Sequence, residues 1–203
     1  MDARANGPWD ASEAPSAPGV DRIDLGALLV TPTTGIDVQA QADQASGTVT
    51  QLTFNRTDAM VQVQPYAAPR SGGMWDDIRA QIATSINSAG GLVEVADGPF
   101  GPELRAQVVP SDGSAGLQPA RFCGIEGPRW FLRAVFLGKA ARPGEAADAL
   151  EAMVRSLVVV RGAEAMPVGA PIPLRLPRTA EEPAQATTLP SPFTRGPEIT
   201  ETR

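Results

Sequence analysis

Histidine is absent from this chain of 203 residues, and cysteine and tyrosine each occur once. Without histidine, the Ser–His–Asp triad and the commonest general base are excluded. The single cysteine, Cys123, excludes a disulfide within the chain, and a zinc centre of His and Cys ligands cannot be assembled. We therefore expect a reducing compartment, with no metal and no cofactor.

Basic clusters are missing as well. The net charge is −6, Lys139 is the only lysine, and no block of arginines stands in the sequence. Binding of duplex nucleic acid needs clustered positive charge, so it is not expected, whereas a small groove for single-stranded nucleic acid stays open. No apolar run reaches the roughly 18 residues of a membrane span, and the N-terminus lacks a signal-peptide pattern. We expect a soluble, cytoplasmic protein without a membrane partner.

Proline, with 20 residues, is concentrated towards the two ends of the chain, together with Ala, Ser, Thr and Glu. Segments rich in Pro, Ala, Ser, Thr and Glu bury too little apolar surface to offset the entropy of ordering. The sequence therefore predicts a flexible N-terminal tail at 1–20 and a single domain at 21–162. A Pro-rich strap and a disordered tail are expected at 163–203.

Within the domain, extended segments outnumber helical ones. The apolar positions Trp75, Ile78, Ile82, Ile86 and Ala89 recur at helical spacing and predict a helix in 74–91. A second helix is predicted at 143–157, where Pro143 suits a helix start. Strands are predicted at 21–32, 35–42, 48–55, 59–66, 91–97, 102–109, 118–126, 129–137 and 158–162. This pattern indicates an α+β fold, with two helices packed on a mainly antiparallel sheet.

The segment GIEGPRWFLRAVFL (124–137) reads as a hairpin. A type II′ turn with Gly127 and Pro128 at its centre would place Ile125 opposite Trp130. Both faces of this hairpin are largely apolar, so it belongs in the middle of the sheet. Trp130 and Phe131 are then expected in the core, and Cys123 as a small buried residue and not a nucleophile.

Arg133 shares one of these apolar faces and needs a partner, because an unpaired buried guanidinium is costly. The candidate partners are Glu94, Glu103 and Glu126, and stacking on Phe122 is another option. Glu126 and Arg129 flank the turn and are expected to form an exposed pair.

Several motifs along the chain carry a resemblance. They are GPWD (7–10), VDRIDLGAL (20–28), SGGMWDDIR (71–79), GPELRAQV (101–108), GPRWFLRAV (127–135), VVVRG (158–162) and PIPLRLP (171–177). Together they resemble an actinobacterial family of uncharacterised soluble proteins, classed as a domain of unknown function. The resemblance implies no established activity and no catalytic residues. The order of elements is also similar to the PsbP-like α/β/α sandwich.

The C-terminal strap has alternating prolines, with Ile172, Leu174 and Leu176 on one side. Prolines favour an extended conformation of low entropy that suits docking in a groove. The strap either docks on its own domain or binds another protein.

The function predicted from these observations is a non-catalytic protein-interaction or scaffold module with a protein partner. The alternative is a protein that binds a small ligand or nucleotide in a cleft, or an enzyme acting through carboxylates. The candidate ligand or partner residues are Arg105, Arg121, Arg133 and Trp130. Asp76 and Asp77 are better explained as first-turn charges that suit the helix dipole than as an acid–base pair.

Overall fold

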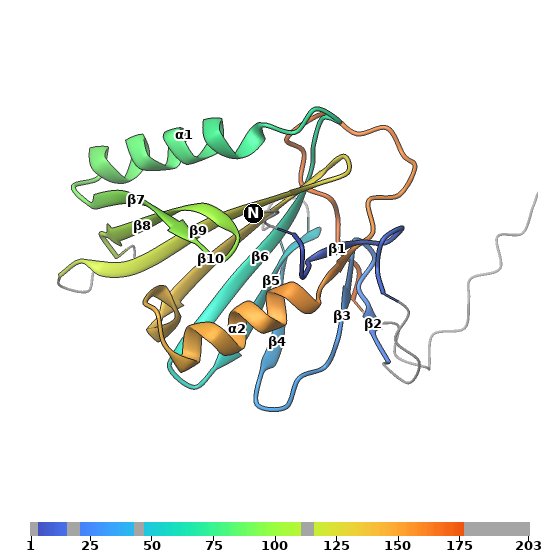
Figure 1. Ribbon diagram of the computed structural model, residues 1–203, viewed down its shortest axis with the longest axis horizontal. Helices are drawn as coiled ribbons and strands as arrows, with labels where there is room; N and C mark the ends of the chain where they lie inside the picture. Colours follow the sequence, from blue (N-terminus) through green and yellow to red (C-terminus); the bar gives the residue numbers. More distant parts are fainter. Residues whose placement is uncertain (1–3, 16–20, 43–46, 111–115, 177–203) are drawn as a thin grey trace, which may run out of the picture.

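The computed structural model describes residues 4–15, 21–42, 47–110 and 116–176, whose strands form two sheets (Figure 1). Neighbouring strands of the larger sheet are antiparallel throughout. Across this sheet the order is β4 (Asp37–Ala42), β5 (Val49–Arg56), β6 (Ala59–Ala67), β10 (Trp130–Gly138), β9 (Gln118–Gly127), β8 (Gly101–Val108) and β7 (Leu92–Gly98). The predicted α+β class with a mainly antiparallel sheet is confirmed.

The smaller sheet consists of short strands and includes the start of the chain. Its order is β1 (Trp9–Asp10), β11 (Val158–Val159), β3 (Leu28–Val30) and β2 (Ile23–Asp24). The β1 strand pairs in parallel with β11, and the indole of Trp130 donates a hydrogen bond of 2.8 Å to the Asp10 carboxylate. Residues 4–15 are therefore not a flexible tail, and the predicted domain start at residue 21 is corrected. A two-residue strand has no periodicity that sequence reasoning could detect.

The two helices cover opposite faces of the large sheet (Figure 1). Helix α1 (Met74–Ser88) lies over β7, β8 and β9, on what we term the α1 face. Trp75 stacks on Phe131 with ring centroids 6.0 Å apart. A Cβ at Gly124 would lie 2.3 Å from the Trp75 ring, so this approach requires glycine. Helix α2 (Glu145–Ser156), preceded by the 3₁₀ turn η1 (Lys139–Ala141), packs on the opposite α2 face.

The main hydrophobic core lies between the α2 face and α2. Its largest members include Phe54, Val61, Ile125, Trp130, Leu132, Phe136, Leu150 and Leu157. Trp130 and Phe131 are both completely buried, as predicted for the centre of the sheet. On α1 only Trp75 is buried, whereas the three isoleucines of the predicted stripe, Ile78, Ile82 and Ile86, are half-buried. The α1 face is thus less completely covered than the α2 face.

The register of the central hairpin differs from the prediction. Trp130 pairs with Gly127, and Ile125 pairs with Leu132. The turn residues are Pro128 and Arg129, and Arg129 takes a positive φ of 61°. Proline at the first central position followed by a positive φ is the pattern of a type II turn. Because the shift is by two residues, each side chain stays on the predicted face.

Glu126 does not form the predicted exposed ion pair with Arg129 but caps a helix. Its carboxylate accepts hydrogen bonds from the backbone amides of Gly73 (2.8 Å) and Trp75 (2.9 Å) at the start of α1. These amides have no partner within the helix, and a carboxylate is favoured at this end of the helix dipole. Arg129 instead donates to the carbonyl oxygen of Gly162. The prediction of a Glu126–Arg129 pair is therefore wrong.

The C-terminal strap docks on its own domain. The amide of Ile172 donates to the Pro65 carbonyl and that of Leu174 to the Val49 carbonyl, at 2.9 and 2.8 Å. Ile172 and Leu174 are buried in the main core, whereas Leu176 is 62% exposed. Residues 163–176 thus continue the fold past the predicted boundary at 162. The disordered tail predicted from residue 177 onward lies outside the described residues.

Helices long and apolar enough to cross a membrane are not found among the described residues.

Candidate functional site

The four residues predicted to line a cleft do not come together in one. Trp130 is completely buried, and its indole is bonded to Asp10. Arg105 and Arg121 are paired neighbours in β8 and β9 on the α2 face. Arg133 follows the pattern of Phe131 and points to the α1 face, on the other side of the sheet.

Arg133 finds neutral partners instead of a carboxylate. Its guanidinium donates a hydrogen bond of 2.7 Å to the side-chain oxygen of Gln64 and lies 5.6 Å from the ring centroid of Tyr66. Of the predicted partners, Glu103 pairs with Arg105 and Arg121, and Glu126 accepts from backbone amides at the start of α1. Glu94 lies on the edge strand β7, three strands away from Arg133 on β10, so the predicted carboxylate partner of Arg133 is corrected. Gln64 and Arg133 are directly opposite each other in β6 and β10, a pairing that requires the sheet order to be known.

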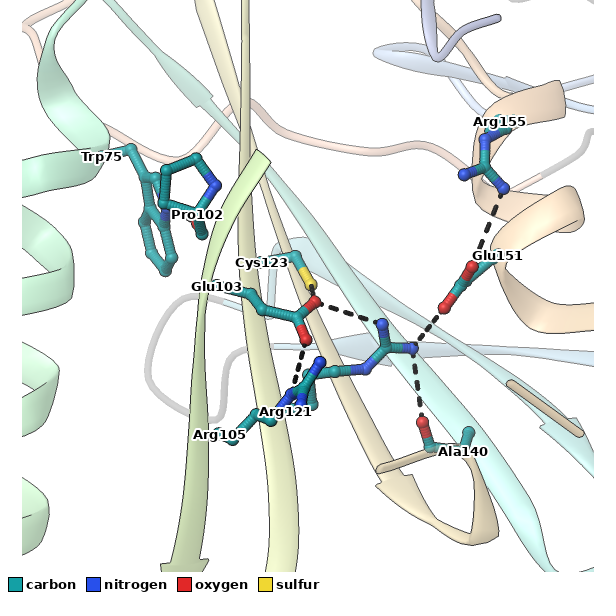
Figure 2. A network of polar contacts seen from close by, with 9 residues as sticks. All are labelled: Trp75, Pro102, Glu103, Arg105, Arg121, Cys123, Ala140, Glu151 and Arg155. Atoms are coloured by element: carbon teal, nitrogen blue, oxygen red, sulfur yellow. Dashed lines mark hydrogen bonds and ion pairs between the residues drawn. The ribbon is translucent and has the colours of Figure 1, made fainter. Parts of the chain in front are cut away.

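Arg121 is the centre of a buried network of charged side chains (Figure 2). Its guanidinium contacts Glu103 at 3.2 Å and Glu151 of α2 at 2.7 Å. It also lies over the ring of Phe136, with 4.2 Å to the centroid. Arg121 and Glu103 are 4% and 1% exposed, so both charges are withdrawn from water and depend on each other.

The network continues to both sides of Arg121. Arg105 pairs with Glu103 at 2.9 Å, and Arg155 lies 3.8 Å from Glu151 (Figure 2). Positive and negative groups alternate along this row. Burial tends to lower the pKa of Arg121, but its neighbours, among them Glu151 and Glu103, outweigh burial and raise that pKa. The row ties β8 and β9 to α2. Its arginines all have carboxylate partners within the chain, and the central one, Arg121, is enclosed and not accessible to a ligand.

Cys123 borders this network and is completely enclosed. Burial raises the pKa of its thiol well above 9.0, with the Glu103 charge adding to the effect and Arg121 opposing it. The sulfur lies 3.6 Å from a Glu103 oxygen, to which the thiol donates. A neutral, inaccessible thiol is a poor nucleophile. The arrangement around Arg121 therefore functions in holding the fold together.

Asp76 and Asp77 are in the first turn of α1, as expected. Asp76 pairs with Arg79 one turn later, at 2.9 Å. In the part of the chain that the structure describes, three or more His, Cys, Asp or Glu side chains nowhere gather in a group that could hold a metal ion.

The edge strand β7 offers a surface of a different kind. It pairs with β8 on one side only, and no backbone hydrogen bond joins its other side to a described segment. Two aliphatic side chains of this strand are largely exposed, Leu92 at 63% and Val95 at 59%. The acidic residues Glu94 and Asp97 are exposed between and beside them. Sequence reasoning predicted the strand but could not place it at an edge.

Three arginines that were not among the predicted site residues share one cavity. Arg70, Arg129 and Arg161 line a hollow of about 570 Å³ between the ends of several strands. Two of them lie in the motifs GPRW and VVVRG, which were noted for their resemblance to a family and not for chemistry. Their distances along the chain gave no signal that they meet.

Comparisons with known proteins identify a family but no activity. Residues 7–183 match the family model described as "Protein of unknown function (DUF3710)", and the chain therefore belongs to that family. No curated protein matches.

Among solved structures, the chain is similar to the solution structure of cyanobacterial PsbP (CyanoP) from Synechocystis sp. PCC 6803. The sequence identity is 11%, with 75% of this chain and 99% of that chain covered. The TM-score is 0.44, so this likeness carries no argument about function.

Proposed function

We propose that this member of the DUF3710 family is a non-catalytic protein-interaction module, and that its β7 edge binds an extended segment of a partner protein. The observation that carries the proposal is the open edge of β7 with its exposed aliphatic side chains. An open edge presents unpaired backbone donors and acceptors, which an added strand satisfies.

The two edges of the large sheet differ in what they expose. At the opposite edge, β4 is irregular between Gln41 and Ala42, and its most hydrophobic residue, Val38, is 41% exposed. The β7 strand runs in unbroken register with β8 over its whole length and exposes more of Leu92 and Val95. Irregular pairing discourages strand addition, whereas a regularly paired strand with exposed aliphatic side chains favours it. This contrast selects β7 as the binding edge.

The side chains of β7 indicate which residue types the partner segment should carry. Val93 and Val95 lie on the α1 face of the strand, and Leu92 lies on the α2 face. Glu94 and Asp97 place negative charge on both faces of the same edge. Opposite charges placed across a strand pair are favourable, and like charges are not. We infer that the partner segment combines aliphatic residues with Lys or Arg.

The non-catalytic character rests on how the candidate groups are used. Arg105, Arg121 and Arg133 are bonded to side chains of this chain, and the Cys123 thiol is enclosed. Ligand binding by the predicted Arg and Trp130 cleft is not proposed, because these residues lie on two faces of the sheet. The strap is not proposed as the docking element either, because Ile172 and Leu174 contribute to the core.

Selection of linear peptides from a displayed random library on the full chain tests the proposal. We expect enrichment of sequences in which aliphatic and basic residues alternate. The substitution Val95→Glu should weaken binding of a selected peptide about tenfold or more, since it removes an aliphatic contact and adds like charge to the edge, a loss of about 1.4 kcal/mol or more. The affinity is measured by isothermal titration calorimetry.

Val38→Glu is the matched control, because it adds the same charge to an exposed valine of the other edge strand. It should leave the affinity within about twofold. Equal weakening by both substitutions, or peptides that bind the Val95→Glu variant as tightly as the parent chain, would refute the assignment to β7.

A further inference from the structure

The cavity lined by Arg70, Arg129 and Arg161 forms where four parts of the chain end close together. They are the end of β1, the segment after β6, the turn between β9 and β10, and the segment after β11. The smaller sheet fixes two of these parts, since the amide of Ala11 donates to the carbonyl of Val159. The amide of Ala68 donates to the carbonyl of Arg129, and this bond joins the segment after β6 to the turn between β9 and β10. The cavity is therefore part of the fold and does not depend on one loop.

Positive charge in this cavity exceeds negative charge. None of the ion pairs formed among the described residues includes Arg70, Arg129 or Arg161. Among the described residues, Asp10 is the only acidic one in the lining. The local excess of positive charge is notable in a chain whose net charge is −6.

The Asp10 carboxylate is already occupied. One of its oxygens accepts from the Ser12 amide at 2.9 Å and from the Ser12 hydroxyl at 2.6 Å. The other accepts from the Trp130 indole at 2.8 Å. Although burial raises its pKa, these bonds and the Arg4 charge outweigh that effect and hold the pKa of Asp10 below its usual 3.8. Asp10 remains ionised at neutral pH and is directed towards its own partners.

Two of the arginines are oriented by backbone carbonyl groups. Arg161 donates through Nε to the carbonyl of Arg129 and through Nη1 to that of Glu164, both at 3.2 Å. Arg129 donates through Nη2 to the carbonyl of Gly162. Carbonyl groups fix a guanidinium without cancelling its charge, and each guanidinium keeps further N–H donors. Arg70 is exposed and forms no ion pair with a side chain of the described residues.

We propose that this cavity is a binding site for a small molecule that carries a phosphate monoester. Three guanidinium groups suit a dianion with several acceptor oxygens, because charge-assisted and forked hydrogen bonds to phosphate are among the strongest available to proteins. The volume of about 570 Å³ lies within the range of small-molecule sites. Ala11, Pro128 and Val160 supply apolar walls for the remainder of the ligand.

The site is independent of the protein-binding edge. Figure 1 shows β1 and β7 at opposite sides of the molecule. The two proposals can therefore fail separately.

Calorimetric titration of the full chain with phenyl phosphate at low ionic strength tests the site. We expect a Kd of about 1 mM or tighter, and Arg70→Glu should raise it at least about tenfold. Arg70 is suited to the test because it is exposed, so its substitution should leave the fold intact. Arg142→Glu is the control, since Arg142 is another exposed arginine and lies away from this cavity.

The pH dependence of the affinity for phenyl phosphate gives a second readout. Phosphate monoesters become dianions above about pH 6, so affinity should rise between pH 5.5 and 7.5, values on either side of that ionisation. The chain has no histidine, the residue type whose charge ordinarily changes in this pH range. Asp10 stays ionised over the same range, because its lowered pKa is far below it. The rise would therefore report the charge of the ligand.

Three results would overturn the proposal. One is the absence of measurable binding of phenyl phosphate. Another is an equal loss of affinity with Arg70→Glu and Arg142→Glu, which would show that only the overall charge matters. The third is binding of a phosphoserine peptide without binding of phenyl phosphate, which would assign the site to a protein ligand.

Discussion

At the scale of single residues, the arginines divide into those that hold the fold and those that remain available. Arg121 is enclosed between two carboxylates and a ring, and Arg133 is bonded to Gln64. Among the described residues, Arg129 and Arg161 are bonded only to carbonyl groups. The sequence shows all of them as arginines beside apolar residues. Their roles depend on which carboxylates the folded chain brings near, and that requires the arrangement of the strands.

Arg121 provides a direct test of the buried network. Arg121→Met should lower the free energy of unfolding by about 3–5 kcal/mol, because it leaves Glu103 and Glu151 buried without their shared partner. Urea unfolding followed by tryptophan fluorescence gives the value.

Arg105→Met is the matched control. It removes the outer partner of the same Glu103, but the Arg105 side chain is 41% exposed, so the expected loss is about 1 kcal/mol or less. Similar losses for the two substitutions would show that Arg121 is not the centre of the network.

At the scale of elements, the pattern of apolar residues predicted both helices and nearly all strands. What it could not predict were features that depend on contacts distant in sequence. Glu126 caps α1 from the turn of a hairpin about 50 residues away, so its role has no local signal. The hairpin turn was placed one residue too early, which shifts the strand register by two, because Gly-Pro suits one turn type and Pro-Arg another, and a positive φ at Arg129 was not anticipated.

The strap shows the same limit. Its alternation of proline and aliphatic residues suits docking, but the sequence does not say on what surface. Ile172→Asp should lower the free energy of unfolding by about 2–4 kcal/mol, because it places a charge in the main core.

Leu176→Asp makes the same change at the exposed end of the alternating series and should alter stability by less than about 0.5 kcal/mol. Both values come from urea unfolding. A strap that contributes nothing to the fold would give two small and equal effects.

At the scale of the whole molecule, the chain is a layered α+β domain with two surfaces that its internal contacts leave unused. One is the acidic and aliphatic edge of β7, and the other is the arginine-lined cavity beside β1. The strands β7 and β1, beside which these surfaces lie, are at opposite sides of the molecule (Figure 1). Neither surface could be predicted from the sequence. The β7 surface depends on the position of that strand at the sheet edge, and an acidic chain without basic blocks gave no indication that Arg70, Arg129 and Arg161 line one cavity.

The central claim is that a partner segment adds to the β7 edge as a further strand. In an antiparallel sheet, alternate amides of an edge strand point away from its neighbour and exchange freely with solvent until another strand binds. Amide hydrogen exchange of the full chain, measured with and without a selected peptide, tests this claim most directly. We predict that alternate amides between Leu92 and Gly98 become protected while those of β4 do not change, and an unchanged β7 would contradict the claim.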